Sequence, residues 1–290
     1  MSPPSAVADV RARLLAGLPV SDRRIEVAGI TTAVVEGGDG PPLVLLHGAN
    51  ASAVMWLRVL PDLVERYRII APDLPGHGAT DAHATSLGAE RVLAWLDELI
   101  AKTCPEPPLV VGNTLGGAIA ARFAIAHPER VRRLVLVDPL GLETFVPRPE
   151  FGMALGAFVA DPSPETYDRL WQQCAFDVEP LRASLGARWK QLETYSLAGA
   201  RDPRLVAVQQ SLMGAFVMTP IPERELAALR VPTALIWGRG DRAIAVSVGE
   251  AASARYGWPL DVIDAAGDAA PLEQPADFAR ALRRADRDRV

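Results

Sequence analysis

The feature that most constrains this chain is a short apolar run that meets a cluster of small residues. Residues 109–111 (Leu-Val-Val) precede Gly-Asn-Thr-Leu-Gly-Gly at 112–117, and an Ala-rich segment with helical spacing then runs from 118 to 126. This order predicts a buried strand, a sharp turn and a helix. Glycines on both sides suit a turn in which neighbouring backbones approach so closely that a Cβ would obstruct them. The middle residue, Thr114, is therefore expected to project from the end of the strand, beside the first turn of the helix.

Apolar runs and helical patterns alternate up to residue 140 and again from residue 230. Unbroken apolar runs, as at 43–46 and within the strand predicted at 133–138, are typical of strands that are buried on both faces of a parallel sheet. Two runs with alternating apolar positions, 24–30 and 31–35, predict an antiparallel hairpin near the start. Further strands are predicted at 67–71, 232–237 and 260–263, and further helices at 6–17, 55–66, 87–102, 247–256 and from 271 onward. The pattern indicates an α/β fold with a mostly parallel sheet.

Between residues 141 and 229 this alternation stops, and helical patterns broken by prolines replace it. We expect this segment to form a helical lid inserted after the sixth strand, and residues 1–140 and 230–290 to form the core domain. Most large apolar side chains of a lid pack it on itself, but ligand pockets are also mostly apolar. The residues predicted to face a pocket under the lid are Phe151, Phe158, Trp171, Trp189 and Phe216.

Composition narrows the classes of partner. With 290 residues, 49% of them hydrophobic, the chain suits one α/β domain with a sizeable insertion. A net charge of −5 without any basic block argues against a nucleic-acid partner. No apolar stretch approaches the ~18 residues of a membrane span, and residues 1–20 lack the apolar centre of a signal peptide. A cytoplasmic protein with no membrane partner is expected, and its two cysteines, Cys104 and Cys174, are expected to be buried thiols.

Several landmarks, in order along the chain, resemble the α/β-hydrolase family. The tight turn at 112–116 is similar to the family's nucleophile elbow, Gly-x-Ser-x-Gly. The resemblance implies the α/β-hydrolase fold: a mostly parallel eight-stranded sheet flanked by helices, with the helical lid after strand six. The other landmarks are His-Gly at 47–48, Asp-Leu-Pro-Gly-His-Gly at 73–78, His-Pro-Glu-Arg-Val at 127–131, Gly-Arg-Gly-Asp at 238–241 and Gly-Asp-Ala-Ala-Pro-Leu-Glu-Gln-Pro at 267–275.

The resemblance also implies roles for individual residues. Thr114 stands where the family has its nucleophile, Asp268 where it has the histidine base, and Asp241 where it has the acid of the triad. The backbone N–H groups of Ala49 and Leu115 would polarise an oxyanion. The remaining residues of the implied oxyanion and substrate-binding loop are His47, Gly48 and Asn50.

None of the four histidines is expected to replace the missing base. His47 and His77 belong to turns that the fold explains, and His127 precedes Pro128 at the far end of the elbow helix. His83 lies in an apparent loop and is the one free candidate, although a surface histidine is the expectation for it. Because no two histidines have ligand spacing on one helix, we expect no metal site, and we expect no cofactor.

Both substitutions weaken the acyl transfer that the family performs. The methyl group of Thr114 crowds an attack on a carbonyl, and a β-branched residue is strained at the positive φ of an elbow. A carboxylate with a pKa of ~3.9, as at Asp268, is a poor base for an alcohol. Neighbouring carboxylates such as Asp241 and Asp268 raise each other's pKa, so one of them can stay protonated and exchange protons with a substrate. Asp138 is a second possible acid, but we favour a structural role for it in the turn before Pro139.

We therefore expect a non-hydrolytic enzyme: a lyase, cyclase or isomerase that acts by non-covalent acid–base catalysis on an apolar, oxygenated small molecule. Two alternatives stay open. One is a hydrolase of an ester, lactone or epoxide that uses Thr114 or a water activated by an aspartate. The other is a catalytically silent protein that binds a small molecule. The sequence predicts neither the identity of the substrate nor the oligomeric state.

Overall fold

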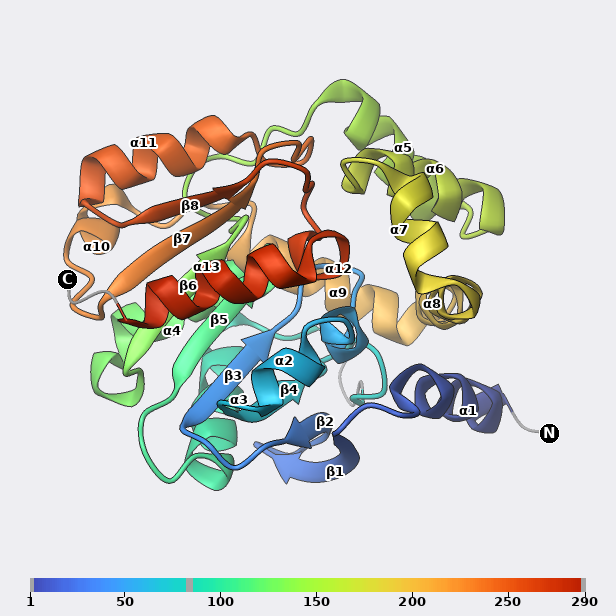
Figure 1. The fold of residues 1–290 in the computed structure, drawn as a ribbon, viewed down its shortest axis with the longest axis horizontal. Coiled ribbons are helices and arrows are strands. Elements are labelled where there is room, and N and C mark those ends of the chain that lie inside the picture. Colours follow the sequence, from blue (N-terminus) through green and yellow to red (C-terminus); the bar gives the residue numbers. More distant parts are fainter. Residues whose placement is uncertain (1–2, 82–85, 288–290) are drawn as a thin grey trace.

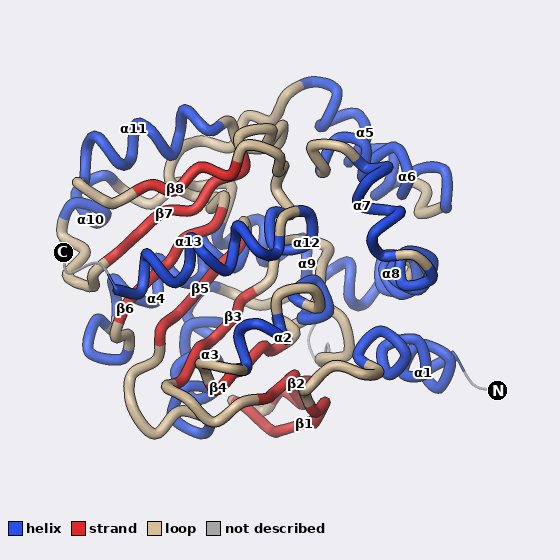
Figure 2. Tube along the Cα trace, viewed as in Figure 1, coloured by secondary structure: helices blue, strands red, loops and turns tan. Residues whose placement is uncertain are grey.

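The computed structural model describes residues 3–81 and 86–287, and its centre is one eight-stranded sheet (Figures 1 and 2). The strand order is β1-β2-β4-β3-β5-β6-β7-β8. From β4 across to β8 every neighbouring pair is parallel, whereas β2 pairs antiparallel with both β1 and β4. The predicted fold class is confirmed. The strands are β1 (Ser21–Val27), β2 (Ile30–Gly37), β3 (Pro42–Leu46), β4 (Arg68–Pro72), β5 (Leu109–Asn113), β6 (Arg133–Val137), β7 (Thr233–Gly238) and β8 (Leu260–Ile263).

The middle of the sheet is the centre of the core. Every residue of β3, β5, β6 and β7 is buried, because helices cover both faces of the sheet. Figure 1 shows α13 (Pro275–Arg287) in front of the strands, and α3 (Ala89–Thr103) and α4 (Leu115–Ala126) behind them. The other elements of the core are α1 (Pro3–Leu15), η1 (Ala53–Trp56), α2 (Leu60–Val64), η2 (Pro128–Arg130), α11 (Val246–Tyr256) and α12 (Ala270–Glu273).

The predicted boundaries of two elements are wrong for local reasons. Ile30 starts β2 instead of ending the first strand, because Ala28 and Gly29 form a two-residue turn with φ of 48° and 74°. The helix predicted over 55–66 divides into η1 and α2. Pro61 lies in the first turn of α2, where its missing N–H is tolerated, but it cannot continue a helix from η1.

Helices fill the long connection between β6 and β7, as the proline-broken pattern indicated. All of them except the last, which directly precedes β7, lie beyond the carboxyl ends of the parallel strands (Figure 1). We call this segment the cap; that residues 141–229 form a separate domain stays a prediction. Its helices are α5 (Pro149–Ala160), α6 (Pro164–Cys174), α7 (Val178–Leu185), α8 (Ala187–Ala200), α9 (Pro203–Phe216) and α10 (Glu223–Ala227).

The N-terminal helix α1 contacts the cap helix α8, and one buried arginine joins them to the core. Arg11 Nη1 donates to Asp73 Oδ2 at 2.7 Å and to the Tyr195 hydroxyl at 3.2 Å. Its Nε and Nη2 donate to the Asp22 carboxylate at 2.8 and 3.0 Å. A single guanidinium therefore connects α1, the loop after β4, and the cap.

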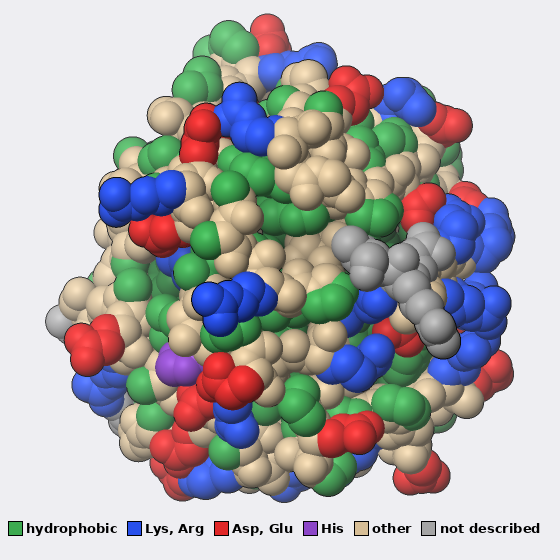
Figure 3. Space-filling view, turned by 90° about the vertical axis from the view of Figure 1, so that its left-hand side faces the viewer, with side chains coloured by type: hydrophobic (Ala, Val, Ile, Leu, Met, Phe, Trp, Pro, Cys, Tyr) green, Lys and Arg blue, Asp and Glu red, His purple; other side chains and the backbone are tan. Residues whose placement is uncertain are grey.

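Acidic and basic side chains are interspersed on the face drawn in Figure 3, with hydrophobic side chains between them. This mixture accords with a net charge of only −5. None of the described helices is both long enough and apolar enough to cross a membrane.

Candidate active site

The sharp turn between β5 and α4 holds Thr114 in an uncommon backbone conformation, with φ of 42° and ψ of −107°. Its N–H donates to Val137 O at 3.0 Å, which ties the turn to the end of β6. A Cβ on Gly112 would collide with the backbone of Gly116, and one on Gly116 would collide with the carbonyl of Leu46. The tight turn thus depends on the glycines that the sequence places around it.

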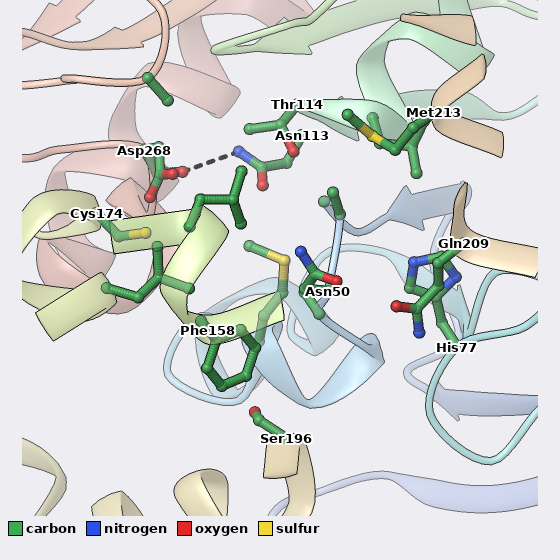
Figure 4. A pocket seen from close by; sticks show the side chains of 18 of the residues that line it. Asn50, His77, Asn113, Thr114, Phe158, Cys174, Ser196, Gln209, Met213 and Asp268 are labelled. Atoms are coloured by element: carbon green, nitrogen blue, oxygen red, sulfur yellow. Dashed lines mark hydrogen bonds between the residues drawn. The ribbon is translucent and has the colours of Figure 1, made fainter. Parts of the chain in front are cut away.

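Thr114 opens into a cavity of about 460 Å³ between the core and the cap (Figure 4). This volume lies within the usual range for a small-molecule site. Residues from the loops after β3, β5 and β8 line the core side, and residues from α5, α6, α8 and α9 line the cap side. The lining residues used below are Gly48, Ala49, Asn50, His77, Asn113, Thr114, Leu115, Phe151, Phe158, Tyr167, Trp171, Cys174, Ser196, Gln209, Met213 and Asp268.

Three of the five predicted cap residues, Phe151, Phe158 and Trp171, line this cavity, but the prediction is wrong for the other two. Trp189 packs behind Trp171 with their ring centroids 5.4 Å apart, and the guanidinium of Arg182 lies over its ring. Phe216 is fully buried, and the guanidinium of Arg122 lies 5.7 Å from its ring centre. Both aromatic rings therefore support the cap from behind.

Two backbone N–H groups face the cavity beside Thr114. Ala49 and Leu115 both line it, and neither N–H has an acceptor within the described part of the chain. Leu115 is the first residue of α4, where an N–H has no partner in its own helix. Together these groups form a site that can stabilise a negatively charged oxygen. The neighbouring Gly48 and Asn50 also line the cavity.

His47 does not line the cavity, so the prediction that it binds substrate is wrong. Its Nδ1–H donates to Gly48 O at 2.8 Å, and its Nε2 accepts the N–H of Leu74 at 2.9 Å. Burial lowers the pKa of His47 to about 4, which keeps the ring neutral. The histidine holds the loop after β3 against the loop after β4.

Asp268 lines the same cavity as Thr114, on the loop after β8. Figure 4 shows Asn113 between them, where its Nδ2 donates to the carbonyl oxygen of Asp268 at 3.1 Å. The Asp268 N–H donates to Cys174 O at 3.1 Å, which joins this loop to the cap. Within the described residues, no hydrogen bond joins the Asp268 carboxyl to the Thr114 hydroxyl. The backbone of Asp268 is fixed, and its carboxyl, which also forms a hydrogen bond with the Cys174 thiol, lines the cavity.

Burial raises the pKa of Asp268 well above its usual value, and the charges of Asp241 and Glu273 raise it further. The pKa of the neighbouring Cys174 thiol is also raised, first by burial and then by Asp268. A thiol with a raised pKa stays protonated and is a weak nucleophile. Asp268 is therefore the titrating group of the cavity that is able to accept a proton.

Asp241 lies behind Asp268, whose pKa its charge raises, and does not line the cavity; its role as the acid of the site stays a prediction. Its Oδ1 accepts the N–H groups of Ala243 and Ile244 at 2.7 and 2.9 Å, and its Oδ2 is buried without a partner. Burial raises the pKa of Asp241 to about 7. Asp138 lies nearby with φ of 43°, and its Oδ1 accepts the N–H of Gly238 at 2.8 Å. Both aspartates hold backbone turns behind Asp268.

Glu273, which is half-buried, completes this group of carboxyls. Its two oxygens accept the N–H groups of Gly267 and Phe176 at 2.8 and 2.6 Å. Burial raises its pKa to about 7. Within the described residues no three metal-binding side chains are placed to hold an ion.

Sequence reasoning missed several polar residues of the cavity, among them Asn113, Cys174, His77 and Gln209. Asn113 had a signal, because it is a polar residue at the end of a buried strand, directly before the elbow. Cys174, His77 and Gln209 had none, since only the packing of the cap on the core brings them to the cavity. His83 lies outside the described residues.

The fold and this site define the class of protein. Residues 43–281 match the model of the alpha/beta hydrolase family, and the chain belongs to that family. A pimeloyl-[acyl-carrier protein] methyl ester esterase from Aeromonas hydrophila is 32% identical over 73% of this chain and 82% of its own length. A 2-hydroxy-6-oxo-6-phenylhexa-2,4-dienoate hydrolase from Comamonas testosteroni is 29% identical over 74% of this chain and 76% of its own.

Among solved structures, a 2-hydroxy-6-oxo-6-phenylhexa-2,4-dienoate hydrolase from a Rhodococcus species superposes with a TM-score of 0.79. It is 25% identical, and the match covers 93% of this chain and 100% of that one. These relatives are named as an esterase and as hydrolases, which contradicts the expectation of a lyase, cyclase or isomerase. The alternative of a hydrolase with a divergent site accounts for them better.

Proposed function

We propose that this protein is a hydrolase of a small carbonyl compound of the ester type, which binds in the cavity between core and cap. The observation that carries the proposal is Asp268, a half-buried carboxyl with a raised pKa in the same cavity as Thr114 and two unpartnered N–H groups. The hydrolase names of the relatives support the reaction class.

The raised pKa changes what Asp268 can do. With a pKa of ~3.9 a carboxylate is a poor base, but a general base works best when its pKa lies near the working pH. Burial and the carboxyls of Asp241 and Glu273 move Asp268 in that direction. An aspartate at this position is then a competent base for water. Burial lowers the pKa of His77, the one imidazole in the described lining of the cavity, to about 3, so this ring is a weak base for a hydroxyl group at Thr114.

The reaction follows from this arrangement. The Asp268 carboxylate takes a proton from a water molecule, whose oxygen forms the new bond to the carbonyl carbon. The electron pair of the C=O bond moves to its oxygen, which the N–H groups of Ala49 and Leu115 stabilise. When this intermediate collapses, the bond to the leaving alkoxide breaks, and the alkoxide takes the proton from Asp268. The products are a carboxylic acid and an alcohol.

Thr114 has a positioning role in this scheme. A Cβ on Gly48 would collide with the Thr114 hydroxyl, so that hydroxyl lies directly against the loop that carries Ala49. It can therefore donate a third hydrogen bond to the oxyanion. Its methyl group obstructs its own attack on a carbonyl, and no base is hydrogen-bonded to it among the described residues. We expect no acylated Thr114 during turnover.

The test is hydrolysis of p-nitrophenyl hexanoate at several pH values by the parent protein and by Asp268→Asn. Loss of a general base lowers kcat by about 10²–10⁴-fold, and the parent's rate should rise with pH as Asp268 ionises. Asp264→Asn is the matched control, because Asp264 is an exposed residue of the same loop. An intact mass taken during turnover should show no acyl adduct. An adduct on Thr114, or an Asp268→Asn rate within a few-fold of the parent's, would refute this mechanism.

A further inference from the structure

The cavity has no positive charge on its walls. Its lining contains no lysine and no arginine among the described residues, and its one acidic member is Asp268. Three further carboxyls, Asp138, Asp241 and Glu273, lie behind Asp268 and act on one another's pKa. All three accept hydrogen bonds from backbone N–H groups. This end of the cavity is therefore neutral or negative at every pH.

The nearest cations are held away from the cavity by other partners. Arg242 donates to the carbonyl of Ala175 at 2.7 Å, and Arg122 donates to the carbonyl of Phe216 at 2.9 Å. Arg58 donates to the carbonyl of Leu272, and Arg148, which acts on the pKa of Asp241, is exposed. None of these four arginines belongs to the lining.

The cap side of the cavity offers aromatic rings and uncharged polar groups. Phe158, Tyr167 and Trp171 form a continuous wall, with ring centroids 6.1 Å apart in both neighbouring pairs. Figure 4 shows Gln209 on the opposite side of the cavity from Asp268. Gln209 Nε2 donates to the carbonyl of Gly76 at 3.0 Å, outside the lining. An amide is able to bind a hydroxyl or carbonyl group, but it cannot neutralise a carboxylate.

We propose, building on the proposed function, that the acyl part of the substrate carries no carboxylate, because the cavity rejects one. A carboxylate there would lose its hydration without gaining a counterion, close to a group of carboxyls. The dienoates in the names of several relatives are carboxylates. This chain therefore differs from those relatives in the charge of the molecule it hydrolyses.

The test compares three p-nitrophenyl esters that differ at the far end of a six-carbon acyl chain. The hexanoate ends in a methyl group, the adipate monoester in a carboxylate and the 6-aminohexanoate in an ammonium group. We expect kcat/KM for the hexanoate to exceed that for the adipate monoester by about 100-fold or more, mainly through KM, and the 6-aminohexanoate, whose charge is opposite to that of the carboxyls, to be disfavoured less. An adipate monoester hydrolysed within about 3-fold of the hexanoate would overturn the inference.

A lysine variant tests the physical cause. Met213→Lys introduces an ammonium group at a half-buried lining position, and should raise the ratio of adipate to hexanoate activity by about 10-fold or more. Met153→Lys is the matched control, because Met153 is 68% exposed on α5 and does not line the cavity. If both variants change the ratio equally, the charge of the cavity does not cause the preference for the hexanoate, and the inference is wrong.

Binding of ketones separates this inference from the proposed reaction. The ketone 2-octanone and the anion 7-oxooctanoate differ only in the terminal carboxylate, and neither is an ester. We expect 2-octanone, but not 7-oxooctanoate, to raise Tm. If 2-octanone binds while no ester is hydrolysed, the hydrolase proposal fails and the inference on charge stands. Equal shifts in Tm with both ketones, or no shift with either, would overturn the inference.

Discussion

Thr114 combines a β-branched side chain with a φ of 42°, a region that such residues rarely occupy. The surrounding structure imposes this conformation, because the turn is closed by the hydrogen bond to Val137 O and by close contacts around the glycines. A strained residue in a cavity is a common property of functional sites. Here the strain presents a hydroxyl to the oxyanion loop at some cost in stability.

Thr114→Ser should relieve part of that strain. Removing the methyl group eliminates its crowding with the backbone, so the free energy of unfolding should rise by roughly 0.5–1 kcal/mol. The hydroxyl remains, and kcat for p-nitrophenyl hexanoate should stay within a few-fold of the parent's. Chemical denaturation and a rate assay measure the two effects. A variant that is less stable than the parent would show that the methyl group packs favourably.

Asp241 is the residue whose ionisation should weaken the fold most clearly. Its pKa is raised to about 7 by burial, whereas an unfolded aspartate titrates near ~3.9. A raised carboxyl pKa means that the protonated form is preferred in the fold. The contribution of Asp241 to stability is therefore fully present below about pH 4 and is lost as pH rises through about 7.

Asp241→Asn should remove this dependence. Asn Oδ1 can accept the N–H groups of Ala243 and Ile244, and its amide nitrogen takes the place of the unpartnered Oδ2. Relative to the parent, the variant should gain stability as pH rises from about 4 to about 7, by on the order of 4 kcal/mol at most. The pKa values of His47 and His77 are lowered in the fold, so these histidines make both proteins more stable as pH rises. Subtracting the parent's free energy of unfolding from the variant's at each pH removes this contribution. A difference that does not change with pH would contradict the prediction.

At the scale of elements, α1 is attached to the cap and the core through Arg11. The Asp73 carboxylate that it binds is fully buried and also accepts the N–H groups of Ala53 and Ala79 at 2.6 and 2.7 Å. Ala53 starts η1, which follows the loop that carries Ala49. One ion pair therefore links the N-terminal helix to the loop that carries Ala49.

Arg11→Met should lower the free energy of unfolding by about 3–5 kcal/mol, because it leaves the Asp73 charge buried and unpaired. Adding Asp73→Asn should recover part of this loss by removing the charge. Arg23→Met is the control, since the Arg23–Glu36 pair lies at the surface and should contribute no more than about 1 kcal/mol. Urea denaturation of the four proteins measures these values. Equal losses for Arg11→Met and Arg23→Met would show that burial of the Arg11 pair has no energetic consequence.

At the scale of the whole molecule, the cavity exists only because the cap lies over the carboxyl ends of the strands. Core loops supply the reacting groups, and the cap supplies the aromatic wall. Such a division lets the cap set the size and chemistry of the substrate while the core retains the reaction.

Trp171→Ala should therefore change which substrate is preferred. Removing its ring enlarges the cavity on the cap side, so the acyl chain with the highest kcat/KM among p-nitrophenyl esters should become longer. Trp189→Ala is the matched control: Trp189 contacts Trp171 but does not line the cavity, and its loss should lower Tm without changing the preferred chain. If only Trp189→Ala changes the preferred length of the acyl chain, Trp171 does not form the wall that limits the substrate.

Much of the fold was predictable from sequence, because the physical causes are local. The apolar runs of β3, β5 and β6 identify strands that are buried on both faces, and Gly112 and Gly116 identify the elbow. The order of the motifs that resemble the α/β-hydrolase family indicated how these elements follow one another in the fold. The wrong element boundaries also have local causes: for example, Pro61 divides a predicted helix.

Only the tertiary structure decided which side chains meet at the cavity and how they titrate. Trp171 and Trp189 are the same residue type in one helical segment, yet only Trp171 faces the cavity, because helix packing within the cap turns the other ring away. The pKa of Asp268 is raised by burial and by Asp241 and Glu273, which come from separate loops. Long-range packing sets both properties. The sequence by itself therefore determined the strands, the elbow and the family, and the packed structure raised the pKa of Asp268.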